Sequence, residues 1–262
     1  MEQLQFNEDI KELEEYVKNH IKVIDRPELE HIPLVINAYG GPCSGKSTTC
    51  LHLVAELKKL GYKAEYVSEY AKELVYDNEF AMLDGSLKNQ SKILLEQNKR
   101  VERLVGNVDF IVSDSPILLS PIYTKKENKM FNELVKELNE HYIAFSFFVE
   151  RDVKNFKTEG RIHNLEESVE KDNQIKQMLL NNNIFYGTYT HDTVDKIINN
   201  CIKTFNRIND KKLQADFLLG NGKSKAQAKE LPKEVKKKKV EKNISRDIFN
   251  YKETKQCGKK KR

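Results

Sequence analysis

Apolar and polar positions alternate along the first 210 residues in two distinct patterns. Five short runs, largely apolar or strictly alternating, predict strands at residues 32–38, 62–68, 108–113, 142–149 and 184–189. Longer stretches with apolar residues at helical spacing predict helices at residues 7–22, 47–60, 69–76, 87–105, 128–140, 165–181 and 192–208. Because strands and helices follow one another in turn, the pattern indicates an α/β fold with a parallel sheet covered on both faces.

The length of 262 residues suits one α/β domain with appended segments, and we expect three parts. Residues 1–30 should hold an amphipathic helix, whose apolar side is formed by Ile10, Leu13, Tyr16, Val17 and Ile21. Residues 31–210 should form the α/β domain, which is net acidic. Residues 211–262 contain 18 basic and 6 acidic residues with few apolar ones, which predicts a basic, largely disordered tail. Such a tail can bind nucleic acid or another polyanion.

Cysteine spacing and apolar runs set limits on location. The four cysteines show no paired or metal-ligand spacing, which indicates a reduced protein without disulfides or structural zinc. The N-terminal sequence MEQLQFNEDI has no apolar core of a signal peptide, and no apolar run approaches the length of a membrane span. We therefore expect a cytoplasmic, intracellular protein with no membrane partner.

A glycine-rich motif lies between the first predicted strand and the helix that follows it. Residues 36–49 read INAYGGPCSGKSTT and match Gly-x-x-x-x-Gly-Lys-Ser from Gly40 to Ser47. In this context the motif predicts a phosphate-binding loop, because glycines let main-chain N–H groups approach phosphates and the helix N-terminus favours negative charge. We expect ATP to be held by Gly40, Gly41, Pro42, Cys43, Ser44, Gly45, Lys46, Ser47 and Thr48.

Individual side chains at this loop have distinct predicted roles. Lys46 should reach the β- and γ-phosphates, Ser47 should bind Mg²⁺, and Thr48 should touch the α-phosphate. Asp114, at the end of the predicted strand 108–113, should lie near Mg²⁺, with a water between them. An Asp at a strand end is also typical of a turn cap, and this alternative stays open.

Phosphate loops occur in motors, switches and kinases, and other motifs separate these classes. A switch GTPase needs an Asn-Lys-x-Asp motif, which the sequence lacks. Motor ATPases usually carry a Glu directly after the Asp of this strand, but here Asp114 is followed by Ser115 and Pro116. The missing water-activating Glu favours phosphoryl transfer to an acceptor other than water.

Three further residues are predicted to bind or activate such an acceptor. Glu69 follows the strand 62–68 and should orient the attacking hydroxyl or accept its proton, because ligands bind at the carboxyl ends of parallel strands. An acidic residue that only favours a helix N-terminus is the alternative. Gln97 and Arg100 share one face of the helix 87–105 and should contact the acceptor, unless this face is simply exposed to solvent.

Basic residues follow the fourth predicted strand, in the sequence ERDVKNFKTEGR at 150–161. We expect a mobile lid near residues 150–164 that closes over the triphosphate. Arg151 and Arg161 are its predicted phosphate-binding residues, because guanidinium groups pair well with phosphoryl oxygens. A solvated basic loop is the alternative.

Taken in order, these motifs resemble a known group of proteins. The motifs are GGPCSGKSTT, VSEYAKELV, the Gln-x-x-Arg of the long helix, FIVSDSPIL, and FFVERD with a later Gly-Arg. They are similar to the motifs of P-loop ATPase/kinase proteins often labelled AAA-type in phage genomes. They are also similar to the nicotinamide riboside kinase domain of bifunctional NAD-biosynthesis proteins. The resemblance covers residues 33–205. It implies a nucleoside/nucleotide-kinase-like P-loop NTPase fold, a five-stranded parallel sheet in the order 2-3-1-4-5, and ATP and Mg²⁺ as cosubstrates.

The leading hypothesis is an ATP-dependent phosphotransferase. It would move the γ-phosphoryl group of ATP to a small nucleoside-type acceptor, which could be a nucleoside, nicotinamide riboside or a nucleoside monophosphate. Catalysis would depend mostly on positioning and charge neutralisation. Two alternatives remain: an ATPase that docks on nucleic acid through the basic tail, and a polynucleotide 5′-kinase.

Overall fold

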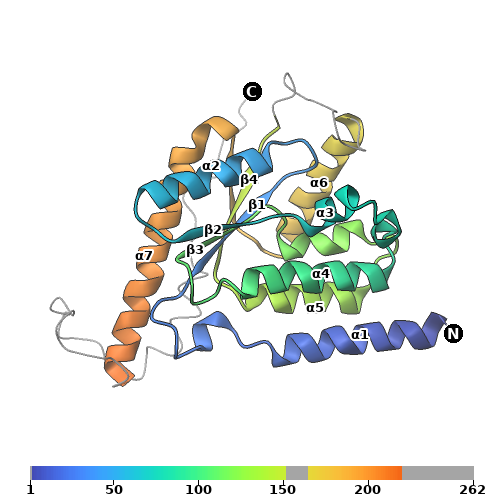
Figure 1. Ribbon diagram of the computed structural model, residues 1–262, viewed down its shortest axis with the longest axis horizontal. Helices are drawn as coiled ribbons and strands as arrows, with labels where there is room; N and C mark the ends of the chain where they lie inside the picture. Colours follow the sequence, from blue (N-terminus) through green and yellow to red (C-terminus); the bar gives the residue numbers. More distant parts are fainter. Residues whose placement is uncertain (1, 152–164, 220–262) are drawn as a thin grey trace, which may run out of the picture. The chain divides into compact units, whose positions relative to one another are not determined.

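The computed structural model describes residues 2–151 and 165–219 (Figure 1). Its centre is a five-stranded sheet in the order β2-β3-β1-β4-β5, in which every neighbouring pair is parallel. The strands are β1 (Leu34–Tyr39), β2 (Ala64–Val67), β3 (Phe110–Ser113), β4 (Ala144–Val149) and β5 (Tyr186–Tyr189). The predicted α/β class, the five strands and their order are confirmed.

Helices connect the strands and cover the sheet on both sides. They are α1 (Glu2–Asn19), α2 (Lys46–Lys59), α3 (Tyr70–Tyr76), α4 (Leu87–Glu102), α5 (Lys129–Glu140), α6 (Leu165–Asn181) and α7 (Val194–Leu219). In Figure 1, α4 and α5 lie on one side of the sheet and α2 on the other. All six residues of β1 are buried, as a central strand covered on both faces requires.

Local sequence signals set several helix ends. The Ser86 side chain accepts a hydrogen bond from the Asn89 N–H at the start of α4, and Asn128 does the same for Phe131 at the start of α5. Short 3₁₀ helices are also present: η1 (Val23–Asp25), η2 (Phe80–Leu83), η3 (Ile117–Tyr123) and η5 (His191–Thr193). Pro121 lies inside η3.

The register of the sheet brings three strand ends together. Asn37 of β1 and Val67 of β2 both lie opposite Ser113 of β3. The segments that leave these strands are the glycine-rich loop after β1, Glu69 after β2 and Asp114 after β3. These segments therefore all begin at the carboxyl ends of the strands, where open α/β sheets bind ligands.

The N-terminal helix is part of the same compact unit as the sheet, which extends to Phe205. Leu13 and Val17 are buried as predicted, and α1 lies beside α4 and α5 (Figure 1). A buried polar network strengthens this contact: Asn98 donates to the Tyr16 hydroxyl at 2.8 Å, and the Tyr142 hydroxyl donates to Asn98 at 3.0 Å. The N-terminal helix therefore packs on the α/β domain through both apolar and polar contacts.

Two further boundaries differ from expectation. Ile21 was placed on the apolar side of the first helix but is 58% exposed, because α1 ends at Asn19. The last helix, α7, continues to Leu219 rather than ending at Ile208, so the expected start of the tail at 211 falls within a helix. A second compact unit begins at Asn206.

Residues 220–262, which make up most of the predicted tail, lie outside the described residues. Within the described ranges, no helix is long and apolar enough to cross a membrane.

Candidate nucleotide-binding site

The glycine-rich loop adopts a backbone that only small residues allow. Gly40 has φ 143° and Gly45 has φ 91°, and Cys43 also has a positive φ of 63°. A Cβ atom on Gly40 would lie 2.7 Å from the Oγ of Ser44, and one on Gly41 would lie 2.7 Å from the Ser168 carbonyl oxygen. The glycines are therefore required by the tight path of the chain. Non-glycine residues with a positive φ, such as Cys43, are uncommon, and those that occur are often found at functional sites.

The loop leads directly into the N-terminus of α2, with Lys46 as its first residue. The Lys46 ammonium group donates to the Gly41 carbonyl oxygen at 3.1 Å, so the side chain folds back across the loop. Thr48 lies on the exposed side of the first turn of α2. A lysine bound over the loop, together with N–H groups at a helix N-terminus, is the arrangement that binds nucleotide phosphates.

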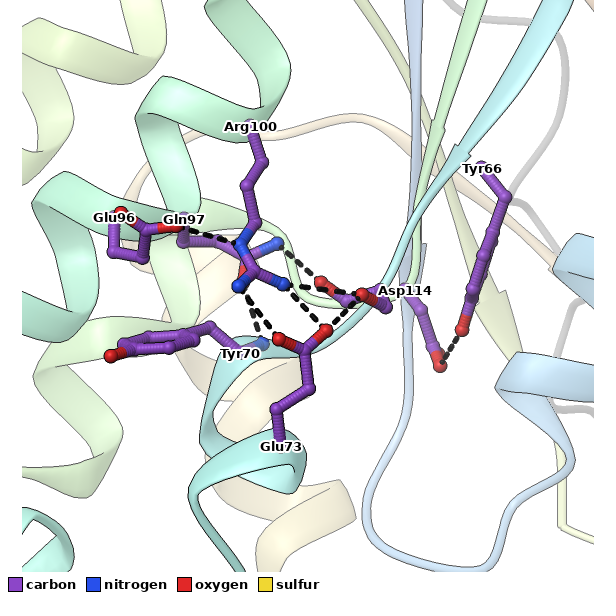
Figure 2. A network of polar contacts seen from close by, with 8 residues as sticks. Tyr66, Tyr70, Glu73, Glu96, Gln97, Arg100 and Asp114 are labelled. Carbon is purple, nitrogen blue, oxygen red and sulfur yellow. Dashed lines mark hydrogen bonds and ion pairs between the residues drawn. The ribbon is translucent and has the colours of Figure 1, made fainter. Parts of the chain in front are cut away.

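A serine and two residues from neighbouring strands form the polar group beside the loop. The Ser47 hydroxyl donates to Asp114 Oδ2 at 2.5 Å, and the Tyr66 hydroxyl donates to the same oxygen at 2.9 Å, as Figure 2 shows for Tyr66. Asp114 is only 2% exposed, and its Oδ1 is buried with no hydrogen-bond partner within the described ranges. The side chain binds hydroxyl groups, which argues against the turn-cap alternative.

These residues fit a magnesium ion by their chemistry. Mg²⁺ prefers oxygen ligands and often retains several waters, so a serine hydroxyl and a nearby carboxylate suit it. The buried, unpartnered Oδ1 of Asp114 is an acceptor that a metal-bound water would satisfy. Burial raises the pKa of Tyr66 well above its usual range, and the charge of Asp114 raises it further, so Tyr66 remains a hydrogen-bond donor at neutral pH.

Glu69 lies at the carboxyl end of β2, where it was predicted to be. It is the residue before α3 and is partly exposed, and its side chain makes no capping hydrogen bond to that helix. Glu69 therefore also lies at the N-terminus of α3, as the helix N-terminus alternative requires.

Gln97 and Arg100, which were predicted to contact the acceptor, both bind protein partners in this structure. Gln97 is buried, and its amide accepts from the Tyr70 N–H at 3.0 Å and donates to the Ser68 carbonyl at 3.1 Å. These two backbone groups flank Glu69 on either side. Gln97 therefore fixes the main chain around Glu69 instead of presenting its amide to a ligand.

Arg100 forms a two-pronged ion pair that joins α4 to α3. Its Nη1 and Nη2 atoms lie 2.6 and 2.7 Å from the two carboxylate oxygens of Glu73, and its Nε donates to Glu96 at 3.1 Å. Its guanidinium carbon lies 4.7 Å from the centre of the Tyr70 ring, an arrangement visible in Figure 2. The hydrogen bonds from Arg100 hold the pKa of Glu73 below its usual range. Arg100 thus stabilises the segment that carries Glu69.

Arg151, which was predicted to bind phosphate from a lid, contacts the main chain of the loop in this structure. Its side chain is 4% exposed, and its Nη1 donates to the Pro42 carbonyl at 2.6 Å. Its Nε and Nη2 atoms contact Asp172 of α6. Arg161 and residues 152–164 of the predicted lid lie outside the described residues.

Sequence reasoning missed two residues of the site. Tyr66 occupies an ordinary alternating position in β2, and Asp172 occupies an ordinary polar position in α6. Neither belongs to a motif, because each acts through a partner far away in the sequence. The hint in the sequence that Tyr66 belongs to the site was its position three residues before Glu69, in the strand that leads to it.

The fold and the loop together define the chain as a P-loop NTPase. A family model described as an AAA domain matches residues 35–192, and the chain belongs to this family. Part of the chain is also similar to the RecA proteins of three bacteria. RecA of Clostridium perfringens strain 13 is 36% identical over 91 residues, and that of Heliobacterium modesticaldum is 33% identical over 91 residues. RecA of Allochromatium vinosum is 34% identical over 97 residues.

The RecA matches are partial in both directions. Each covers 33% of this chain and 26% of the relative, so the chain spans about a quarter of the length of these RecA proteins. They support a P-loop ATPase domain with a distant relationship to part of RecA. The activity of the whole relative does not follow from so short a match.

Proposed function

We propose that this P-loop domain is a phosphotransferase that moves the γ-phosphoryl group of ATP to a small nucleoside-type acceptor. The observation that carries the proposal is the pair of carboxylates at the sheet edge. Asp114 is bound to Ser47 and is followed by a serine, where a hydrolase has its water-activating Glu. Glu69, which follows the edge strand β2, lies at the same end of the sheet and would accept the proton of the acceptor hydroxyl.

The proposed reaction assigns one task to each residue. The acceptor hydroxyl oxygen attacks the γ-phosphorus, the bond from that phosphorus to the β,γ-bridging oxygen breaks, and ADP leaves. Glu69 accepts the hydroxyl proton, and Lys46 neutralises charge on the transferred group. Ser47 and Asp114 would hold Mg²⁺, which supplies further neutralisation of the phosphates.

The acceptor class rests on resemblance. The order of motifs is similar to nicotinamide riboside kinase domains and to AAA-type proteins of phages, which supports a nucleoside, nicotinamide riboside or nucleoside monophosphate. An ATPase that acts on nucleic acid is the second candidate, and a polynucleotide 5′-kinase is related to it. The basic composition of residues 211–262 and the partial similarity to RecA favour these alternatives.

Replacing Glu69 with glutamine tests the proposal. The protein would be incubated with γ-labelled ATP, Mg²⁺ and a panel of nucleosides, nicotinamide riboside, nucleoside monophosphates and DNA or RNA ends. We expect label on one small acceptor, and a transfer rate about 10²–10⁴-fold lower in Glu69→Gln, which is the usual contribution of a general base.

Glu65→Gln is the matched control, since Glu65 lies on β2, the strand that precedes Glu69, and pairs with Lys58 at the surface. Its transfer rate should stay close to that of the unaltered protein. Label found only in free phosphate, and increasing when nucleic acid is added, would reject the kinase and support the nucleic-acid ATPase. Label on polynucleotide ends would identify a 5′-kinase.

A further inference from the structure

A buried ion pair of Arg151 and Asp172 holds the phosphate loop. Asp172 of α6 accepts a hydrogen bond from the Gly41 N–H through Oδ1, at 2.5 Å. Its Oδ2 lies 3.0 Å from Nη2 and 3.1 Å from Nε of Arg151. The Arg151 and Asp172 side chains are only 4% and 11% exposed, so the pair is largely removed from solvent.

The same two residues bind main-chain atoms of two consecutive loop residues, Gly41 and Pro42. Arg151 donates through Nη1 to the Pro42 carbonyl at 2.6 Å, and through Nη2 to the Ser168 carbonyl at 3.3 Å. The Gly41 N–H and the Pro42 carbonyl are thus both held by the pair. A Cβ on Gly41 would lie 2.8 Å from Asp172 Oδ1, so the close approach of Asp172 depends on glycine at this position.

The placement of Asp172 has an electrostatic cost. A carboxylate next to a loop that binds a polyanion repels the phosphates unless its charge is compensated. Arg151 supplies this compensation at hydrogen-bonding distance, in a site where solvent screens little. Removing one member of a buried pair leaves an uncompensated charge, whereas removing both members is often neutral.

We propose that Arg151 and Asp172 are positioning residues that preset the phosphate loop for the triphosphate. Asp172 fixes the Gly41 N–H, and Arg151 both fixes the Pro42 carbonyl and shields the phosphates from the charge of Asp172. A loop held in its binding conformation loses less entropy when nucleotide binds. The inference rests on nucleotide binding within the proposed function, and it does not depend on which acceptor is used.

The test is the affinity for Mg·ATP of the full-length protein, measured by calorimetry for Arg151→Met, Asp172→Asn and the double variant. We expect Arg151→Met to weaken binding about tenfold or more, within the range of coupling energies between contacting residues. Asp172→Asn should stay within about threefold of the unaltered protein, because an amide oxygen can still accept from Gly41. The double variant should bind Mg·ATP more tightly than Arg151→Met, because the uncompensated carboxylate is gone and only the contact with Pro42 is lost.

Two comparisons separate this role from general stability. AMP presents less phosphate charge to the loop, so Arg151→Met should weaken ATP binding more than AMP binding. Lys176→Met is the matched control, since it removes a cation from the same helix, where Lys176 packs on the Phe148 ring. Its affinity should not change.

Several outcomes would overturn the inference. These are unchanged ATP affinity in Arg151→Met, a double variant as weak as Arg151→Met, or equal losses for AMP and ATP. Should Arg151→Met fail to fold, Arg151→Lys replaces it, and recovery when Asp172→Asn is added remains the criterion. Absence of Mg·ATP binding by the unaltered protein would instead reject the nucleotide-binding function itself.

Discussion

Replacing Lys46 with alanine is expected to lower the rate of ATP turnover by about 10²–10³-fold, the usual loss when one group that stabilises transition-state charge is removed. Lys46 begins α2 and already reaches over the loop to the Gly41 carbonyl, so its ammonium group is close to where the phosphates would lie. The variant should fold normally, because Lys46 makes no buried ion pair within the described ranges. Steady-state turnover with saturating Mg·ATP is the measurement.

Lys59→Ala serves as the control for this experiment. Lys59 lies on the same helix, is 70% exposed at the side chain and pairs with Glu56, so its loss should change turnover little. Equal activity of the two variants would mean that Lys46 does not contact the transferred phosphoryl group. The assignment of the loop as the catalytic phosphate site would then be wrong.

Replacing Asp114 with asparagine should raise the Mg²⁺ concentration for half-maximal activity by about 10–100-fold, the range found for residues that support metal ligands. Asparagine keeps the size of the side chain and can still accept from Ser47 and Tyr66, but it has no negative charge. The loss should therefore fall on metal binding more than on folding. A Mg²⁺ titration of turnover, together with a thermal unfolding curve, separates these two effects.

Asp77→Asn is the matched control, because Asp77 is exposed at the end of α3 and makes the same change in charge. Its Mg²⁺ dependence should match that of the unaltered protein. If Asp114→Asn required no more Mg²⁺ than Asp77→Asn, Asp114 would be a structural partner of Ser47 and Tyr66. The metal role would then have to be assigned to another group.

The parts of the fold that sequence predicted well are those with local signals. Residues 165–181 form α6 with the predicted ends, and the buried runs around β1 and β3 form central strands. Each has an apolar pattern that can be read within one window of the chain. The end of α7 could not be predicted in the same way, because its polar composition resembles that of the tail that follows.

The candidate site shows the same division between local and long-range information. The loop with Lys46 and Ser47 was recognisable because the motif specifies its own backbone. The direction of Arg151 was not, because its partner Pro42 lies 109 positions away. Gln97 likewise binds backbone groups 27 and 29 positions away. Both looked like ligand-binding residues by type, and their partners became visible only when the strands and helices were assembled.

The polar network under α1 has a consequence for how this family can vary. Asn98 is fully buried and depends on Tyr16 of α1 and on Tyr142 before β4 for its hydrogen bonds. Loss of one partner leaves a buried amide unsatisfied, whereas a joint change to apolar residues of similar shape can be nearly neutral. In an alignment of relatives, we expect positions 16 and 98 to change together, and a sequence without α1 to lack the asparagine as well. Independent variation at these two positions would contradict this. Joint variation would indicate that the N-terminal helix evolved together with the α/β domain and is not a later addition to it.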